Sequence, residues 1–569
     1  MISLHGKIVA TLVSFTAVIS AAEPVSLKQG QAQLFLDNFI VAKIAGVTRT
    51  MHQPRKLGAV IRSPQPGKTI QTRAAPQWDP VAKVYKLWVL GIDQRLWESR
   101  DGLHWMPGAK PNMRTDLVVV DPLEKDPGRR FKAALANSGF AISPDGANWT
   151  KLDVPRIPSS DESNFSFNPA EGLFIHTVKR GGKYGRSVAL ATSRDFKNWT
   201  DYGLIFQSDD LDQKLGVENI KARLANVSLR PPFHNDPNVY RVDVYNMGAF
   251  YYEGIYIGLP AMYHATGPVP NYPNTDGFHL VQLAMSRDLK NWTDYGLIFQ
   301  SDDLDQKLGV ENIKARLADA SLRPPFHNNP KVYRVDVYNM GAFYYDGIYI
   351  GLPAMYHATG PVPNYPNTDG FHLVQLAMSR DLKNWKRLGD RQPFIGPSRI
   401  DSGAYDLTQI LPPSAPVVRD DELWFYYTGL KYRASYNYVG NFPKGKYVRK
   451  PGLDPDDGAV CLAVLRLDGF ISLDAGREGG RVRTVQFHVP EGKLFVNADA
   501  GLGRLQVEAL DAKGKLVTES VPLNSDKTRH EVQWKKGGLA KLPGRVMSLR
   551  FKIQDASLYS FWFGERSSQ

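Results

Sequence analysis

The sequence holds a single cysteine, Cys461, among its 569 residues. One cysteine excludes an intramolecular disulfide, and it equally excludes zinc ribbons and cysteine-ligated iron–sulfur clusters. Beyond residue 22, no uncharged hydrophobic run approaches the ~20 residues that a membrane-spanning helix needs. We therefore expect no membrane insertion.

The chain also lacks an acidic excess. It carries 70 Lys and Arg against 57 Asp and Glu, which gives a formal charge of +13. A basic surface can favour acidic partners such as sulfated or uronic polysaccharides. The basic residues are scattered, however, and only residues 444–450 (KGKYVRK) approach a cluster. The scatter favours an ordinary solvated surface, and nucleic acid is not expected as a partner because its binding motifs are absent.

Aromatic residues and turn formers are abundant. Phe, Trp and Tyr make up 11% of the chain, which also has 49 Gly and 39 Pro. This composition is typical of many short strands joined by turns. It predicts an all-β protein.

The first 22 residues have the pattern of an export signal. His5 and Lys7 precede an uncharged run over 8–19, and the small residues at 20–22 suit cleavage before Glu23. We expect a mature protein that is secreted or periplasmic, and a monomer.

A long internal repeat stands in the middle of the chain. Residues 200–292 recur at 293–385, and only five of the 93 positions differ. No fold requires so much identity, since structure constrains the pattern rather than every surface residue. Two interpretations stay open: a recent tandem duplication, or an error in the assembled sequence.

A shorter motif, S-x-D-x-x-x-W, recurs five times. Its Asp can accept hydrogen bonds from turn N–H groups, and its Trp can cover the gap between neighbouring sheets. We assign these Asp residues to structure. The copies are Ser99–Trp105, Ser143–Trp149, Ser193–Trp199, Ser286–Trp292 and Ser379–Trp385.

Two or three apolar, β-branched or aromatic runs precede each motif. Three strands, a tight turn and a Trp predict a β-propeller blade, although a β-sandwich with chance turn similarity would give a similar pattern. Without one long copy there are five blades, and the written chain has six. We predict a propeller over 23–474, followed by a C-terminal β-sandwich over 475–569.

These features resemble the five-bladed propeller glycosidases of glycoside hydrolase families 32, 43, 62 and 68. The segments Leu34–Ile40 and Asp401–Gly403 also resemble glycosidase-like exported proteins of planctomycete-type bacteria. The family 32 signature W-M-N-D-P-N-G is absent, so fructan hydrolysis is not implied. The sialidase pattern S-x-D-x-G-x-T-W is not matched either.

Glycoside hydrolysis needs one carboxylic acid to protonate the leaving oxygen and a second carboxylate as base or nucleophile. The innermost strand of each blade lines the propeller axis, so acidic residues at those strands are the candidates. Taken singly, such an Asp is more often a turn cap. The candidate catalytic residues are Asp121, Asp161, Asp243, Asp336 and Asp401.

Sugar sites use aromatic faces and charged hydrogen-bond donors. The candidate substrate-binding residues are Asp37, Arg73, Arg180, Tyr245, Tyr338, His264 and His357. The two histidines could equally be ordinary polar strand residues. They lack the clustered partners of a metal site. No cofactor is expected, and a structural Ca²⁺ at the axis stays open.

The sequence thus predicts an exported glycoside hydrolase acting on plant or algal poly- or oligosaccharides. The main alternative is a non-catalytic carbohydrate-binding propeller, because an extra blade would widen the ring and move opposing carboxylates apart. A protein–protein scaffold that uses the long blade insertions is the third hypothesis.

Overall fold

The computed structural model describes residues 23–566 except 66, 73, 116, 136, 162, 226–231, 233, 253, 271–274, 366–367, 414, 441–443 and 540–541. The predicted export signal and Arg73 lie outside the described residues. The chain divides into two compact units, one holding residues 50–472 and the other holding 23–49 with 473–566. Within the described residues, no helix is long and apolar enough to cross a membrane.

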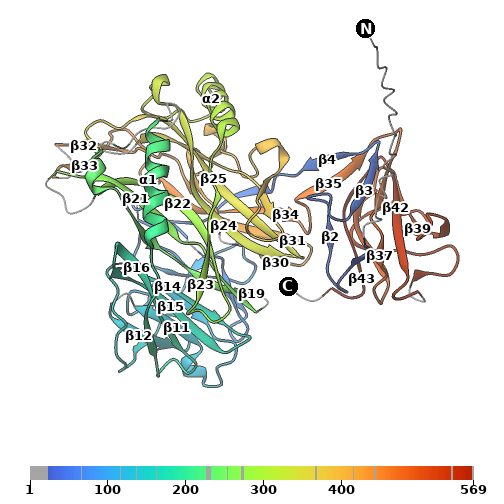
Figure 1. The fold of residues 1–569 in the computed structure, drawn as a ribbon, viewed down its shortest axis with the longest axis horizontal. Helices are drawn as coiled ribbons and strands as arrows, with labels where there is room; N and C mark the ends of the chain where they lie inside the picture. Colours follow the sequence, from blue (N-terminus) through green and yellow to red (C-terminus); the bar gives the residue numbers. More distant parts are fainter. Residues whose placement is uncertain are drawn as a thin grey trace, which may run out of the picture. The chain divides into compact units, whose positions relative to one another are not determined.

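The unit of residues 50–472 is built almost entirely of strands, as the composition predicts (Figure 1). Its first three sheets are antiparallel, with four strands each in chain order. Sheet 1 holds β6 (Gln77–Asp79), β7 (Val84–Trp88), β8 (Leu96–Ser99) and β9 (Met106–Pro107). Sheet 2 holds β10 (Leu117–Val120), β11 (Phe131–Leu135), β12 (Gly139–Ser143) and β13 (Thr150–Lys151). Sheet 3 holds β14 (Ser163–Asn168), β15 (Leu173–Gly182), β16 (Gly185–Ser193) and β17 (Thr200–Phe206).

The two long repeats form sheets 4 and 5. Sheet 4 holds β18 (Arg241–Asn246), β19 (Ala249–Tyr252), β20 (Ile255–Gly258), β21 (Ala261–Pro268), β22 (Thr275–Ser286) and β23 (Trp292–Phe299). Sheet 5 holds β24 (Arg334–Tyr345), β25 (Ile348–Pro361), β26 (Thr368–Val374), β27 (Ala377–Ser379) and β28 (Lys386–Arg387). The strand register is the same in both copies, with Asp243 opposite Tyr263 and Asp336 opposite Tyr356.

The repeat begins at an outer strand. β17, at the start of the first copy, completes sheet 3, and β23, at the start of the second copy, completes sheet 4. Each copy then supplies a helix, α1 (Asp210–Ala225) or α2 (Asp303–Ala318), before the strands of the next sheet. A 93-residue insertion therefore adds a complete sheet and leaves its neighbours complete.

Sheet 6 is closed by a strand from the start of the unit. It holds β29 (Gln409–Leu411), β30 (Val417–Arg419), β31 (Glu422–Leu430) and β34 (Gly458–Arg466), and β5 (Arg55–Arg62) pairs with β34. Between β31 and β34 the chain makes a separate hairpin of β32 (Tyr436–Val439) and β33 (Lys446–Arg449).

Each sheet packs on the next in chain order, and the sixth packs on the first. Sheets 3 and 4 share a cluster that includes Val188 and Val242. Sheets 5 and 6 are joined by a backbone hydrogen bond from the His372 N–H to the Thr408 carbonyl, at 2.9 Å. Ring contacts cross the other interfaces: Trp88–Phe131, Phe140–Trp199, Tyr252–Tyr344 and Trp105–Tyr426.

The S-x-D-x-x-x-W motif forms the same turn in all five places. In the third copy, the Asp195 carboxylate accepts hydrogen bonds from the backbone of Lys197 and Asn198. Partial burial raises the pKa of Asp195, but the hydrogen bonds outweigh this effect and lower the pKa to about 2. The structural role predicted for the motif Asp is confirmed. The residue after it is left-handed in every copy: Gly102, Gly146, Phe196, Leu289 and Leu382.

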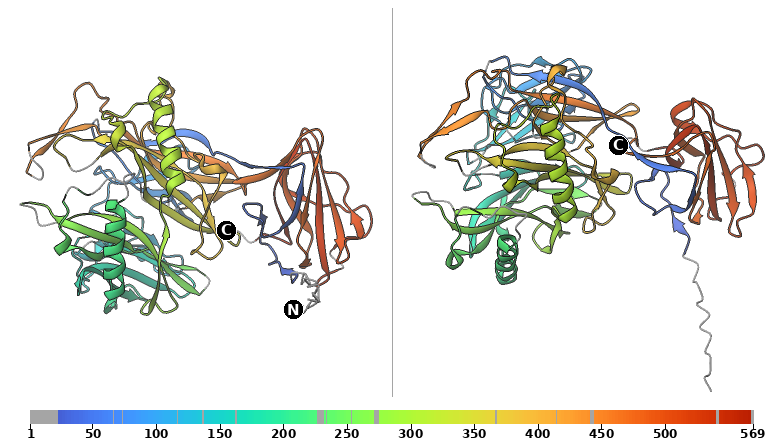
Figure 2. Two further views of the ribbon diagram at one scale, coloured as in Figure 1. Left: turned by 45° about the horizontal axis from the view of Figure 1, so that its top comes forward. Right: turned by 90° about the horizontal axis from the view of Figure 1, so that it is seen from above.

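The other unit combines both ends of the described chain (Figure 2). One of its sheets contains β1 (Val25–Ser26), β3 (Val41–Ala45), β36 (Gly480–Thr484), β37 (Phe487–His488), β39 (Arg504–Asp511), β40 (Leu516–Glu519) and β42 (Val546–Gln554). The second contains β2 (Gln33–Leu34), β4 (Thr48–Met51), β35 (Ile471–Ala475), β38 (Leu494–Asp499), β41 (Asp526–Glu531) and β43 (Ala556–Phe563). Both sheets contribute to one hydrophobic core.

This arrangement corrects the predicted boundary, which placed residues 23–49 with the propeller. β3 pairs with β36 and β2 pairs with β43, so the first strands complete the C-terminal sheets. Pairing partners more than 400 residues apart leave no local pattern in a sequence. Asp37 belongs to this unit, where its carboxylate accepts a hydrogen bond from the Phe39 N–H.

Candidate active site

Three of the five candidate carboxylates lie where the first strand of a sheet begins. Asp161 stands two residues before β14, and Asp243 and Asp336 are the third residues of β18 and β24. Asp401 lies in an exposed 3-10 turn, Ile400–Ser402, ahead of β29. Asp121 follows the last residue of β10 and so lies at the other end of its strand.

Asp121 is held in a buried ion pair. Its Oδ2 lies 2.7 Å from Lys132 Nζ, and its Oδ1 accepts a hydrogen bond from the Leu123 N–H. Lys132 also contacts Glu124, at 3.0 Å. These contacts give Asp121 the geometry of a turn cap that anchors a buried lysine.

Asp243 is enclosed by cationic groups. Its side chain is 1% exposed, and Arg186 Nη2 lies 2.7 Å from its Oδ1. Arg241 Nε lies 3.9 Å from its Oδ2. The β15–β16 hairpin comes so close that a Cβ on Gly185 would lie 3.0 Å from Asp243 Oδ2, and Gly185 has φ +118°. Glycine is therefore required at this point of the hairpin.

Tyr245 lies against the same cations. Lys179 Nζ is 4.1 Å from the centre of its ring, and the Arg186 guanidinium is 4.8 Å from it. Lys179 Nζ is also 2.7 Å from Asp161 Oδ1, and the Asp161 side chain is 62% exposed. Asp161, Asp243 and Tyr245 thus belong to one charged cluster where sheets 3 and 4 meet.

The second copy of these residues is more open. Asp336 is 24% exposed, with Arg334 Nε at 2.8 Å and Arg223 Nη2, from α1, at 3.8 Å. Tyr338 is 49% exposed. The Tyr338 ring lies edge-on to His372, with ring centres 4.7 Å apart. On the neighbouring strand, the ring of Tyr356 lies 4.4 Å from the Arg433 guanidinium.

The copies differ because their neighbours differ. Sheet 3 offers Arg186 to Asp243, whereas Asp336 has sheet 4 and the end of α1 beside it. Sequence reasoning treated Asp243 and Asp336 as equivalent, since their flanking residues are the same. Only the packing order separates an enclosed carboxylate from an accessible one.

The remaining candidates for substrate binding lie elsewhere. Arg180 makes a bidentate ion pair with Asp201 of β17, at 3.0 and 2.6 Å. His264 and His357 are buried beneath α1 and α2, where Nδ1 of each faces a backbone carbonyl. Burial lowers the pKa of both histidines to about 4.

Sequence reasoning missed Lys179, Arg186, Arg223 and Arg433, which surround the candidate carboxylates and tyrosines. It also missed Asp457, which lies just before β34. Burial raises the pKa of Asp457 to about 6. Asp457 Oδ1 accepts a hydrogen bond from the Tyr432 N–H at 3.2 Å, and Arg449 Nη1 lies 3.7 Å from its Oδ2. The run of acids at 454–457 was the available signal.

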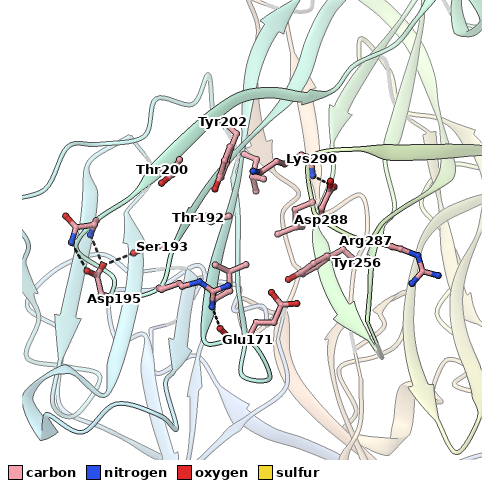
Figure 3. A pocket seen from close by; sticks show the side chains of 15 residues that line it. Glu171, Thr192, Ser193, Asp195, Thr200, Tyr202, Tyr256, Arg287, Asp288 and Lys290 are labelled. Carbon is pink, nitrogen blue, oxygen red and sulfur yellow. Dashed lines mark hydrogen bonds between the residues drawn. The ribbon is translucent and has the colours of Figure 1, made fainter.

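A hollow of about 440 Å³ lies at the C-terminal end of β16, between the turns of sheets 3 and 4 (Figure 3). Glu171, Tyr202, Tyr256 and Lys290 line it, together with the turn residues Asp195 and Asp288.

No group of three or more His, Cys, Asp or Glu side chains that could hold a metal ion occurs within the part of the chain that the structure describes.

No family model matches the chain, and no curated protein matches it. Solved structures similar to it include an N-acetylgalactosamine deacetylase from F. plautii in complex with blood group B trisaccharide. The two share 13% identity at a TM-score of 0.30, over 62% of this chain and 89% of that one. A glycosyl hydrolase from Bacteroides ovatus matches at 13% identity and a TM-score of 0.26, over 77% and 94%. A Bombyx mori GH32 beta-fructofuranosidase matches at 11% identity and a TM-score of 0.27, over 89% and 95%. These TM-scores are low, so the function proposed next rests on the geometry of the chain itself.

Proposed function

We propose that the protein is an exported glycoside hydrolase acting on plant or algal poly- or oligosaccharides, with its site at the start of β18 and β24. One observation carries this proposal. Carboxylates, partly open tyrosine rings and guanidinium groups come together there from several sheets. Sugar binding uses aromatic faces with charged hydrogen-bond partners, and glycoside hydrolysis adds carboxylates to that set.

We further propose that sheets 1 to 6 are the six blades of a propeller and that the other unit is a β-sandwich. The cyclic packing of the sheets and the strand β5, which joins the start of the unit to sheet 6, support the ring. The first strand of each sheet would then line the axis of this ring. The starts of β14, β18 and β24 would face a common opening that bears Asp161, Asp243 and Asp336.

Two carboxyl groups have environments suited to different steps. Asp336 is accessible and lies beside two arginines, a position that suits a base or nucleophile. Burial raises the pKa of Asp457 to about 6, so this carboxyl keeps its proton in mildly acidic solution and suits a general acid. Asp161 and Asp243, already paired with Lys179 and Arg186, would position these cations.

The test is a screen of the purified protein on aryl glycosides and on neutral and acidic polysaccharides, read as release of reducing ends. The proposal expects turnover on at least one substrate, with a loss of rate above about pH 6 as Asp457 loses its proton. Binding without turnover on every substrate would reject it.

The alternative of a non-catalytic carbohydrate-binding propeller has one observation in its favour. Asp161, Asp243 and Asp336 each already have a cationic partner within 2.8 Å. Three such pairs could equally form a fixed polar rim. Turnover in the screen separates the two functions.

A further inference from the structure

Four arginine side chains, from α2, the loop after it, β24 and the loop after β31, hold buried N–H groups for which the described residues offer no acceptor. They are Nη1 of Arg316, Nε of Arg323, Nη1 of Arg334 and Nε of Arg433. A buried donor left without an acceptor is unfavourable, and folded proteins keep few of them. Such donors favour a ligand rich in acceptor oxygens.

Contacts place these arginines together. Arg316 Nη2 donates to the Arg323 carbonyl at 2.7 Å and also to the Leu407 carbonyl. Arg323 lies 5.3 Å from the ring of Tyr432, the residue before Arg433.

Arg433 continues the group toward the open tyrosine. Its guanidinium lies 4.4 Å from the ring of Tyr356 and 5.9 Å from that of Tyr338, while Arg334 is bonded to Asp336 two residues before Tyr338. Arg433, and Arg334 through Asp336, thus lie near Tyr338, while Arg316 lies over Phe371 and Arg323 over Tyr432.

The neighbouring carboxylates do not balance this charge. Asp336 is shared between Arg334 and Arg223. Asp369 already accepts hydrogen bonds from the backbone of His327 and Gly370. Asp319, at the end of α2, is bonded to Ser321. Near Asp336 and Tyr338, the three arginines Arg223, Arg334 and Arg433 therefore outnumber Asp336 and Asp369, whose oxygens are already engaged.

We propose that the saccharide bound here carries an anionic substituent, a carboxylate or a sulfate group, held by Arg433 with Arg334 and Arg223 beside it. A guanidinium presents two parallel N–H groups that match the oxygens of either group. The 49% exposed ring of Tyr338 offers a face for the sugar that bears the charge. This inference rests on the proposed function and names the class of its substrate.

The test is isothermal titration calorimetry of the full chain with three probes of similar size: trigalacturonate, a sulfated galacto-oligosaccharide and neutral xylotriose. At least one charged probe should bind about tenfold or more tightly than xylotriose, and added salt should weaken its binding. The preferred charged probe then distinguishes carboxylate from sulfate. Equal binding of the neutral probe, or no binding of either charged probe, would overturn the inference.

Two variants localise the effect. Arg433→Met and Arg223→Met should each lower the affinity for the charged probe about tenfold, and Arg433→Lys should lose less than Arg433→Met. Lys125→Met, which removes one exposed charge from the loop after β10, is the matched control and should bind as the wild type does. If Arg433→Met unfolds, Arg223→Met alone decides, and unchanged binding would contradict the assignment.

Calorimetry reads binding whether or not hydrolysis follows. Selective binding without release of reducing ends would reject the glycosidase and keep the anionic ligand. Turnover of neutral substrates alone would support the glycosidase and reject the anionic ligand.

Discussion

At the scale of single residues, the two long repeats give the molecule an internal comparison. Asp243 and Asp336 have the same neighbours in sequence and the same register, yet one is 1% and the other 24% exposed. The difference comes from Arg186, which only the first copy meets. The first carboxylate therefore stabilises the fold, while the second faces solvent where a substrate could reach it.

Asp243→Asn should lower the free energy of unfolding by about 1–3 kcal/mol, because Arg186 would keep its charge and lose a charged acceptor. Asp336→Asn, its counterpart in the second repeat, should cost less than about 1 kcal/mol, since its surroundings are partly solvated. Urea unfolding of the two variants measures both values. Equal losses would show that the enclosure of Asp243 has no energetic consequence.

Sequence reasoning proposed the acids of this region from their places at strand starts and the tyrosines as aromatic faces for a sugar. It could not predict Arg186, Arg223 or Arg433 beside them. These side chains arrive from a hairpin, a helix end and a loop whose positions depend on how the sheets pack. Asp457 was missed for the same reason, since its burial depends on the loop around Tyr432 and Arg449.

At the scale of elements, α1 and α2 are seated on their sheets through a glycine and a histidine. A Cβ on Gly216 would lie 2.1 Å from Val242 Cγ2, and one on Gly309 would lie 1.9 Å from Val335 Cγ2. His264 and His357 lie next to the same contacts, 3.6 Å from each such Cβ. Both helices are thus held at the closest distance that the backbone allows.

Gly216→Ala and Gly309→Ala should each destabilise the protein by about 1–3 kcal/mol, because the added methyl group forces the helix away from the sheet. The expected loss is a net value, since alanine favours the helix itself by about 1 kcal/mol. Glu218→Ala, at an exposed position of α1, is the control and should be nearly neutral. Stabilisation by either glycine substitution would contradict the close contact.

The buried histidines predict a loss of stability in acid. An unfolded histidine titrates near 6.5, whereas His264 and His357 titrate near 4 in the folded protein. Between these values the unfolded chain binds more protons, so the free energy of unfolding falls as the pH falls. The loss approaches ~1.4 kcal/mol per pH unit for each histidine.

Urea unfolding at about pH 7.5 and about pH 5.5 measures this dependence. Replacing His264 and His357 by Gln should reduce it by about 2–3 kcal/mol. The same pH dependence in the double variant would assign the loss to other groups.

At the scale of the whole molecule, local sequence patterns predicted the strand content and the succession of sheets but not the long-range strand pairing. The strand-rich composition, the motif turns and the repeat predicted an all-β chain of successive sheets. The closure of sheet 6 by β5 and the pairing of β1 to β3 with C-terminal strands were not predicted. These pairs join segments roughly 400 to 530 residues apart, and the sequence of an edge strand does not identify its partner strand.

Deletion of residues 293–385 tests whether each repeat adds one complete sheet and leaves the neighbouring sheets intact. It would join Trp292 to Lys386, which reproduces the native junction of Trp385 with Lys386, and it would remove one complete sheet. The shortened chain should fold with a single cooperative transition for what remains of the unit of residues 50–472. An aggregated product, or one without a cooperative transition, would contradict the account of sheets 4 and 5.

The central proposal is that Asp336, near the start of β24, takes part in glycoside hydrolysis. The most direct measurement is the initial rate of reducing-end release by Asp336→Asn on the best substrate of the screen, with its unfolding midpoint recorded alongside. The account predicts a rate about 100-fold or more below that of the wild type, at a nearly unchanged midpoint. A variant that keeps the wild-type rate would contradict it.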